Sequence, residues 1–162
     1  MTVGVLTISD KGARGEREDV SGREVIKLLK ELAATIAVYE IVPDERNVIA
    51  EKLSAYADLR KLDLVVTTGG TGVSPRDVTP EATKDIIDRE LPGFSEAMRS
   101  ESLKKTPHAM LSRSIAGIRK RTLIINLPGS PRGARENLAV VMPAIKHAIE
   151  KIQGDQSDCG GD

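Results

Sequence analysis

Short apolar runs rich in β-branched residues alternate along the chain with longer segments whose apolar residues follow helical spacing. The runs predict four strands, at residues 3–9, 35–42, 62–68 and 122–126. An apolar stripe opposite lysine and glutamate predicts an amphipathic helix from Val25, Ile26, Leu28, Leu29 and Leu32. Further helices are expected at residues 45–59, from Pro80 with Thr79 as its cap, at 93–103, and at 131–152, kinked or restarted at Pro143.

Strand and helix alternate almost throughout, with a polar loop at residues 10–19 and a loop with short extended pieces at 106–121. This order is typical of an α/β fold, so we expect a three-layer αβα sandwich with a mostly parallel central sheet. A chain of 162 residues with 40% hydrophobic content suits one domain. We place that domain at residues 1–153 and a flexible polar tail at 154–162.

Composition restricts the kinds of partner. Lysine plus arginine and aspartate plus glutamate number 24 each, so a net charge of zero gives no reason to expect nucleic acid or a membrane as a partner. One Phe, two Tyr and no Trp leave little for base stacking. The single cysteine, Cys159, excludes an intramolecular disulfide and a multi-cysteine metal site. Met1 leads into a strand-like segment with no signal peptide, so we expect a cytoplasmic protein.

The most informative stretch is LVVTTGGTGVSPRDVTP at residues 64–80, where a strand ends in three glycines within four positions. Glycines at 69, 70 and 72 permit positive φ angles and let backbone N–H groups converge on an anion. Hydroxyl donors could come from Thr68, Thr71 and Ser74. The loop is neither a P-loop nor a dinucleotide-binding fingerprint, because both patterns are absent. The alternative is an ordinary tight turn.

A second loop strengthens the prediction of an anion site. Ligands of such sheets bind beyond the carboxyl ends of the strands. The loop after the last strand, residues 126–130 (Asn-Leu-Pro-Gly-Ser), places a glycine and a serine at a helix start, where free N–H groups and the helix dipole favour negative charge. The alternative for Ser130 is a plain N-cap.

Two acidic residues, Asp44 and Asp77, also follow predicted strands, and the pair Ser9 and Asp10 follows a third. Asp44 could simply cap a helix, at about 1 kcal/mol, and Asp77 could form an Asx-turn. However, carboxylates beside a phosphate repel it unless a cation lies between them. Mg²⁺, held by one or two carboxylates and substrate phosphates, is the simplest such cation.

The two histidines give no catalytic signal. His108 follows a proline in a loop, and His147 lies among lysine and alanine on the last predicted helix. A surface role is expected for both, and no Ser-His-Asp or Cys-His arrangement can be assembled.

The chain resembles the molybdopterin adenylyltransferases, the family that includes the corresponding domains of plant enzymes and of gephyrin. The resemblance lies in VLTISDKG at the start, TTGGTGVSPRDVTPEAT at residues 67–83 and the long segment 91–131 ending in LIINLPGSP, and it extends over residues 3–154. It implies transfer of AMP from ATP to molybdopterin with Mg²⁺, release of pyrophosphate, a homotrimer, and a possible transfer of the product to a molybdate insertase.

The resemblance also implies roles for individual residues. Asp44 and Asp77 match the magnesium-binding and catalytic aspartates, and residues 69–72 match the phosphate-binding loop. Arg76 and Arg113 could neutralise charge as pyrophosphate leaves. The candidate substrate-binding residues are Ser9, Asp10, Thr68, Gly69, Gly70, Thr71, Gly72, Ser74, Arg76, Thr79, Ser112, Arg113, Ser114, Asn126, Pro128, Gly129 and Ser130. Ser130 departs from the family, where many relatives carry an amide side chain.

The absence of a histidine or cysteine motif suits this chemistry. The nucleophile is a substrate phosphate whose second pKa is about 6, so no protein base is required. Catalysis then consists of holding two anions in line and neutralising charge. Two alternatives remain at this point: a nucleotide pyrophosphatase, and a pterin-binding or scaffolding protein without catalysis.

Overall fold

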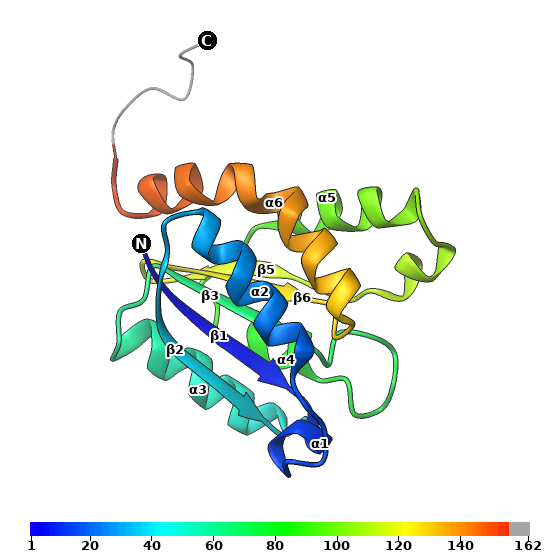
Figure 1. Cartoon of the computed structure of the whole chain (residues 1–162). Coiled ribbons are helices and arrows are strands. Elements are labelled where there is room, and N and C mark those ends of the chain that lie inside the picture. The colour runs from blue at the N-terminus through cyan, green and yellow to red at the C-terminus, as the bar shows by residue number, and fades with distance from the viewer. Residues whose placement is uncertain (156–162) are drawn as a thin grey trace.

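The computed structural model describes residues 1–155, and within them six strands form one sheet in the order β2-β1-β3-β6-β5-β4 (Figure 1). The strands are β1 (Thr2–Ile8), β2 (Thr35–Val42), β3 (Leu64–Thr68), β4 (Arg89–Glu90), β5 (Ala116–Arg119) and β6 (Thr122–Leu127). The first three and β6 are mutually parallel, whereas β5 is antiparallel to both of its neighbours. The predicted mostly parallel sheet is therefore confirmed.

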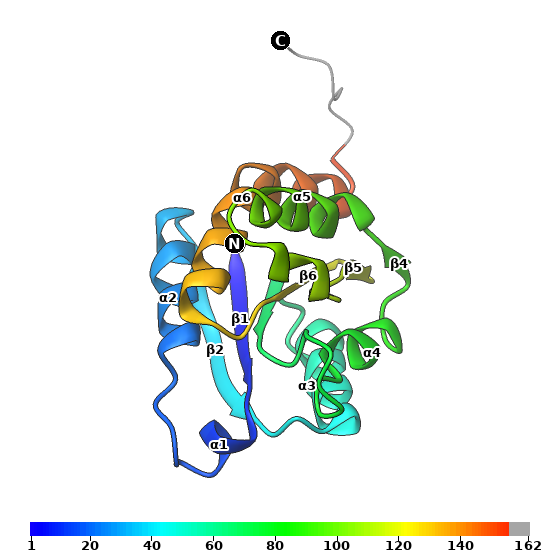
Figure 2. The same ribbon diagram turned by 90° about the vertical axis from the view of Figure 1, so that its right-hand side faces the viewer.

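Helices cover both faces of the sheet (Figures 1 and 2). They are α2 (Val20–Glu31), α5 (Pro92–Leu103) and α6 (Pro131–Ile152) on one face, and α3 (Arg46–Asp58) and α4 (Thr79–Lys84) on the other. Strand side chains alternate between the two layers: Val3 and Val5 join the core under α2 and α6, whereas Leu6 and Ile8 join the core under α3. Both layers are packed with buried Leu, Ile and Val, which confirms the predicted αβα sandwich.

The last helix runs through Pro143 without interruption, so the expected restart is wrong. Figure 1 shows that α6 bends along its length, which agrees with the expected kink. Proline removes one backbone N–H and faces the carbonyl of Ala139 four residues earlier. Both residues lie on the exposed side of α6, so water can reach that carbonyl. On the opposite side Val141, Ile145 and Ile149 are buried in the core and hold the helix together across the missing bond.

Four local features differ from the sequence predictions. The expected loop after β1 contains the short helix α1 (Asp10–Ala13), and the expected loop after α5 contains the 3-10 helix η1 (Pro107–Leu111). Strand β5 is one of the short extended pieces that were expected in that loop. The N-cap of α4 is Val78, not Thr79. Strand β4 has only two residues, too few for a periodic pattern to reveal it.

The described residues include no helix that is both long and apolar enough to cross a membrane. The predicted tail at 154–162 falls almost wholly on residues 156–162, and with Cys159 it lies outside the described part of the chain.

Candidate functional site

Four loops meet at one edge of the sheet because the parallel strands end at the same level. Thr7 of β1 pairs with Thr68 of β3, which in turn pairs with Leu127 of β6, and Ile8 pairs with Val42 of β2. The loops after these four strands therefore lie together, as expected for a ligand site in an open α/β sheet.

The glycine loop after β3 adopts the conformation that its sequence predicts. Gly69 and Gly70 have φ angles of 105° and 64°, which L side chains rarely adopt. A Cβ on Gly70 would lie 2.4 Å from Thr79 Oγ1 and 3.2 Å from Asp44 Oδ1. Gly72 has no positive φ, but its Cβ would lie 2.9 Å from Asp77 Oδ2. The glycines therefore let both acidic side chains approach the loop.

Gly69 is needed for packing between loops. Its N–H donates to Leu127 O at 3.2 Å, and its Cα lies 3.2 Å from the position that a Cβ on Gly129 would take. The N–H of Gly69 is therefore used within the protein and is not aimed at a ligand. For Gly69 the alternative of a structural turn is therefore correct. The hydrogen bond to Leu127 and the close approach to Gly129 hold the loops after β3 and β6 together.

Arg113 holds the glycine loop from outside. Its Nε donates to Gly72 O at 2.6 Å, its Nη2 donates to Asp77 O at 2.5 Å, and its backbone N–H donates to Thr71 O at 2.9 Å. Its Nη1 forms an ion pair with Glu81. The guanidinium donors thus fix the loop backbone, so the observed role of Arg113 is to shape the loop.

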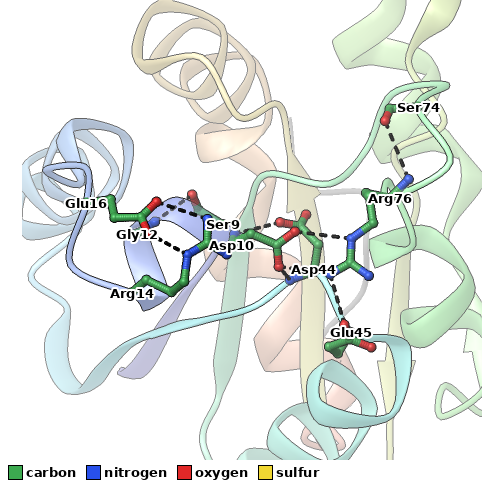
Figure 3. A network of polar contacts seen from close by, with 9 residues as sticks. All are labelled: Ser9, Asp10, Gly12, Arg14, Glu16, Asp44, Glu45, Ser74 and Arg76. Carbon is green, nitrogen blue, oxygen red and sulfur yellow. Dashed lines mark hydrogen bonds and ion pairs between the residues drawn. The ribbon is translucent and has the colours of Figure 1, made fainter.

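Asp44 and Asp10 exchange hydrogen bonds between the ends of β2 and β1 (Figure 3). The Asp10 N–H donates to Asp44 Oδ2 at 2.8 Å, and the Asp44 N–H donates to Asp10 Oδ1 at 3.0 Å. The N-cap of α3 is Glu45, which makes no side-chain cap bond, so the alternative role of Asp44 as the helix cap is wrong. Its carboxylate instead remains at the sheet edge, half-buried.

Burial raises the pKa of the Asp44 carboxyl, and the negative charges of Asp10 and Asp77 act in the same direction. The N–H of Asp10 and the charge of Arg76 oppose this effect. In contrast, the hydrogen bonds from Arg76 lower the pKa of Asp10. Asp44 is thus a carboxylate whose charge is incompletely compensated by the protein, which favours binding of a cation.

Asp77 lies at the other end of the glycine loop. Its Oδ2 accepts a hydrogen bond from the Ser74 N–H at 2.8 Å, which is a local loop contact of the kind that the alternative predicted. The same oxygen lies against Gly72, at the wall of a cavity.

Two cavities meet at the glycine loop, and each contains one of these aspartates. The larger has a volume of about 510 Å³ and includes Asp77, whereas the smaller has a volume of about 390 Å³ and includes Asp44. They share the wall formed by Gly70, Gly129 and Ser130. Ser130 is the N-cap of α6 and accepts from the Gly133 N–H at 3.1 Å, so the start of that long helix lies at the junction.

The far wall of the larger cavity comes from residues that the sequence did not single out. Asn137 of α6 is buried; its Nδ2 donates to Ser102 Oγ of α5 at 3.1 Å and to Gly133 O at 2.9 Å. The basic residues of this wall are Arg99, Lys105, His108 and Arg132. His108 is exposed, as expected, but it also lines the cavity.

The smaller cavity includes Asp19 and Ser21, which the sequence also left unmarked. Asp19 caps α2: its Oδ1 accepts from the Gly22 N–H at 2.9 Å, and its Oδ2 accepts from the hydroxyls of Thr7 and Tyr39 at 2.5 and 2.6 Å. Ser21 donates to Gly129 O at 2.6 Å. The sequence Asp19-Val20-Ser21 before a predicted helix could have indicated a helix cap, but it gave no sign that these residues line a cavity.

The structure divides the candidate residues into two groups. Those that line a cavity are Ser9, Asp44, Thr68, Gly69, Gly70, Thr71, Gly72, Asp77, Ser112, Pro128, Gly129 and Ser130. Those that line neither of the two are Asp10, Ser74, Arg76, Thr79, Arg113, Ser114 and Asn126.

The buried members of the second group support the loop from beneath. Asn126 is fully buried, and its Nδ2 donates to Thr67 and Thr83 at 3.0 Å, while its Oδ1 has no hydrogen-bond partner among the described residues. The Thr79 hydroxyl donates to Gly69 O at 2.9 Å. Ser114 is buried and accepts from Ser112. Buried positions behind the loop explain why these side chains do not reach a ligand.

The two aspartates suit a hard cation that is completed by other ligands. The described residues contain no cluster of three or more His, Cys, Asp or Glu side chains that could hold a metal alone. Mg²⁺ commonly takes only one or two protein carboxylates and obtains the rest of its oxygens from water and phosphate. Asp44 and Asp77, one on each side of the glycine loop, match that donor set.

Comparison with known proteins gives consistent matches along nearly the whole chain. The family model described as "Probable molybdopterin binding domain" matches residues 4–147. The molybdopterin adenylyltransferase of Helicobacter pylori strain J99 is 50% identical over 155 residues, covering 94% of this chain and 88% of that protein. Gephyrin of Dictyostelium discoideum is 50% identical over 160 residues, which cover 93% of this chain but 22% of gephyrin.

A solved structure agrees with this result. The crystal structure of the molybdopterin biosynthesis enzyme MoaB from Thermus thermophilus superimposes with a TM-score of 0.90 at 52% identity, covering 95% of this chain and 97% of that one. The resemblance noted in the sequence motifs is thereby confirmed, and the chain belongs to the family of probable molybdopterin-binding domains.

Proposed function

We propose that this protein is a molybdopterin adenylyltransferase, which transfers AMP from ATP to the terminal phosphate of molybdopterin and releases pyrophosphate. The proposal rests on the pair of adjoining cavities, of which the larger contains Asp77 and the smaller contains Asp44. A reaction between two bulky anions needs two neighbouring compartments that meet at a site for phosphates. The relatives named molybdopterin adenylyltransferase, at 50% and 49% identity, support the same reaction.

The reaction needs no nucleophile from the protein. An oxygen of the molybdopterin phosphate forms a bond to the α-phosphorus of ATP, and the bond from that phosphorus to the bridging oxygen of pyrophosphate breaks. Gly70, Gly72 and the start of α6 at Ser130 provide bare backbone where the phosphates meet, so peptide dipoles stabilise the added charge. Arg113 keeps this backbone in place.

Asp44 and Asp77 would hold the Mg²⁺ ion, which supplies charge neutralisation to the phosphates when bound. The burial that raises the pKa of Asp44 supports this assignment, because a cation would relieve that cost.

The test is an assay with purified protein, ATP, Mg²⁺ and molybdopterin, in which adenylylated molybdopterin and pyrophosphate should accumulate together. AMP formed without the pterin would instead indicate a nucleotide pyrophosphatase. Binding of the pterin with no turnover would indicate a scaffolding protein.

The cavities also permit a test of substrate placement. Asn137→Ala changes the far wall of the larger cavity, and Ser21→Ala changes the smaller one. We expect the two variants to raise KM for different substrates, because each substrate occupies one cavity. An equal rise for the same substrate in both variants would show that one ligand spans both cavities.

Assembly as a homotrimer and transfer of the product to a molybdate insertase remain predictions from the resemblance, and a cytoplasmic location remains a prediction from the sequence. Light scattering after size-exclusion chromatography tests the trimer, and coelution with an insertase tests the transfer.

A further inference from the structure

Arg76 lies beside the site but lines neither cavity, and its contacts are to carboxylates of other loops (Figure 3). Its Nε donates to Asp10 Oδ2 at 3.1 Å, and its Nη2 donates to Asp10 Oδ1 and to Glu45 Oε1, both at 2.9 Å. A two-point fork of this kind fixes the orientation of both partners. The Nε and Nη2 groups of Arg76 are therefore already hydrogen-bonded to carboxylates of the protein.

We infer that Arg76 and Asp10 are positioning residues, which hold the Asp44 carboxylate at its place beside the glycine loop, and that Arg76 does not bind phosphate. This inference deepens the proposed function and rests on it for its effect on turnover. The contacts themselves come from the geometry of three loops.

The loop that carries Asp44 has few other restraints. It follows β2, which is an edge strand and pairs only with β1 among the described strands. The exchange of hydrogen bonds with Asp10 attaches it to the end of β1. Arg76 then attaches Asp10 to the loop after β3, which carries Asp77 as the next residue. The two aspartates are thus connected through Asp10 and Arg76.

Charge explains why the connection needs an arginine. Three carboxylates, those of Asp10, Asp44 and Glu45, lie close together. Arg76 pairs with Asp10 and Glu45, and its positive charge also acts on Asp44. The other nearby charges are Asp77, which acts on Asp44, and Arg14, which acts weakly on Asp10 while pairing with Glu16. Without Arg76, mutual repulsion would separate Asp10 and Asp44.

The contribution to stability should nevertheless be small. The side chains of Arg76 and Asp10 are 53% and 29% exposed, and exposed ion pairs contribute little to stability because water screens them. An effect of Arg76 on turnover can therefore be separated from an effect on folding.

The experiment compares the Mg²⁺ dependence of turnover in the intact protein and in Arg76→Ala. We expect the Mg²⁺ concentration for half-maximal turnover to rise by about tenfold or more, which is the usual effect of losing a residue that orients a metal ligand. The KM for ATP at saturating Mg²⁺ should stay unchanged. A raised KM for ATP with an unchanged Mg²⁺ requirement would show that Arg76 binds phosphate, and it would overturn the inference.

Four further variants sharpen the result. Asp10→Asn should produce a similar shift, and the double variant should show no further loss, because the two residues act as a unit. Arg76→Lys should recover part of the effect by restoring the charge without the fork. Arg14→Ala is the matched control. Among the described residues this nearby arginine forms its ion pair with Glu16 and acts only weakly on Asp10, so its loss should change neither constant.

A crystal structure of Arg76→Ala gives a readout that does not depend on turnover. We expect Asp44 Oδ2 to leave the Asp10 N–H. If the intact protein proves inactive but Asp44 is displaced in the variant, the proposed function fails while the positioning role holds. If Asp44 keeps its place in the variant, the positioning role is wrong whatever the activity.

Discussion

Two aspartate–arginine pairs of similar geometry lie at opposite edges of the sheet. At the edge with the cavities, Arg76 forms its fork with Asp10. At the other edge, Arg119 at the end of β5 donates from Nε to Asp58 Oδ1 at 3.1 Å and from Nη2 to Asp58 Oδ2 at 2.6 Å. The side chains of the second pair are each only 22% exposed, and Arg119 also donates to Ile86 O at 2.6 Å.

The difference between the pairs lies in what surrounds them. Arg119 connects α3, the segment after α4 and strand β5, and it lines neither of the two cavities at the glycine loop. Arg76 instead pairs with Asp10 and Glu45, and Asp10 is hydrogen-bonded to Asp44, which lines a cavity. The same side-chain chemistry thus supports the fold at one edge and is proposed to organise a site at the other, and four experiments test that contrast.

The largest effect is expected for Asp77→Asn, which should lower turnover by about 100-fold or more, because a carboxylate that acts at the phosphates is lost while the shape is kept. Asp58→Asn is the control at the other edge and should leave turnover unchanged. Steady-state assays of both variants decide the point, and equal turnover of Asp77→Asn and the intact protein would contradict the metal assignment.

Gly72→Ala should lower turnover by about tenfold with little change in Tm. The added Cβ would lie 2.9 Å from Asp77 Oδ2, so that the carboxylate must move. Gly70→Ala is a poor probe of the same idea, because φ at Gly70 is 64° and the backbone itself would be strained. Turnover and circular dichroism melts measured together check the prediction, and a large fall in Tm for Gly72→Ala would count against it.

Arg119→Ala should reduce the free energy of unfolding by about 1–2 kcal/mol and leave the Mg²⁺ dependence of turnover unchanged. The loss comes from two charge-assisted bonds to Asp58 and one bond to a backbone carbonyl. Urea denaturation measures it, with Arg76→Ala as the comparison, in which stability should change less. A larger loss of stability in Arg76→Ala would reverse the contrast between the two edges.

The smallest effect is a pH dependence of opposite sign at the two edges. Arg119 and Lys120 lower the pKa of Asp58 from 3.8 to about 2, so its contribution to stability is present above 3.8 and disappears as pH falls towards 2. Burial raises the pKa of Asp44, so its ionised form costs stability at neutral pH and this cost vanishes below 3.8.

Melting curves of the two asparagine variants measure this contrast. At pH 7, Asp58→Asn should melt below the intact protein, whereas Asp44→Asn should melt at the same temperature or above it. Both differences should shrink as the pH approaches 2. A strongly lowered Tm for Asp44→Asn at neutral pH would show that its charge stabilises the fold.

Most of the fold was predictable because its signals are local. β-branched runs such as Leu64–Thr68 form buried central strands, and the stripe around Val25 and Leu29 packs on them. The predictions failed where the signal was short. Strand β4 has only two residues and the helix α1 only four, too few for a periodic pattern.

The site was predictable only in part. The glycine loop, Asp44 and Asp77 follow strands, so their meeting at one edge follows from the parallel order. The far wall of the larger cavity could not be foreseen, because Ser102 and Asn137 resemble ordinary polar residues on helices until α5 and α6 pack together. Arg113 was expected beside phosphate, but its fork instead holds backbone carbonyls of the glycine loop.

The sequence by itself therefore determined the order of strands and helices, the bare glycine backbone and the family to which the chain belongs. Only the tertiary structure decided which side chains face a cavity and which support the loop, and that Arg76 joins Asp10 and Glu45. The physical reason is the distance along the sequence over which each signal acts. Hydrophobic periodicity and φ preference depend on a few neighbouring residues. Contacts such as Asp10–Arg76 join positions 66 residues apart and form only when the strands are in register.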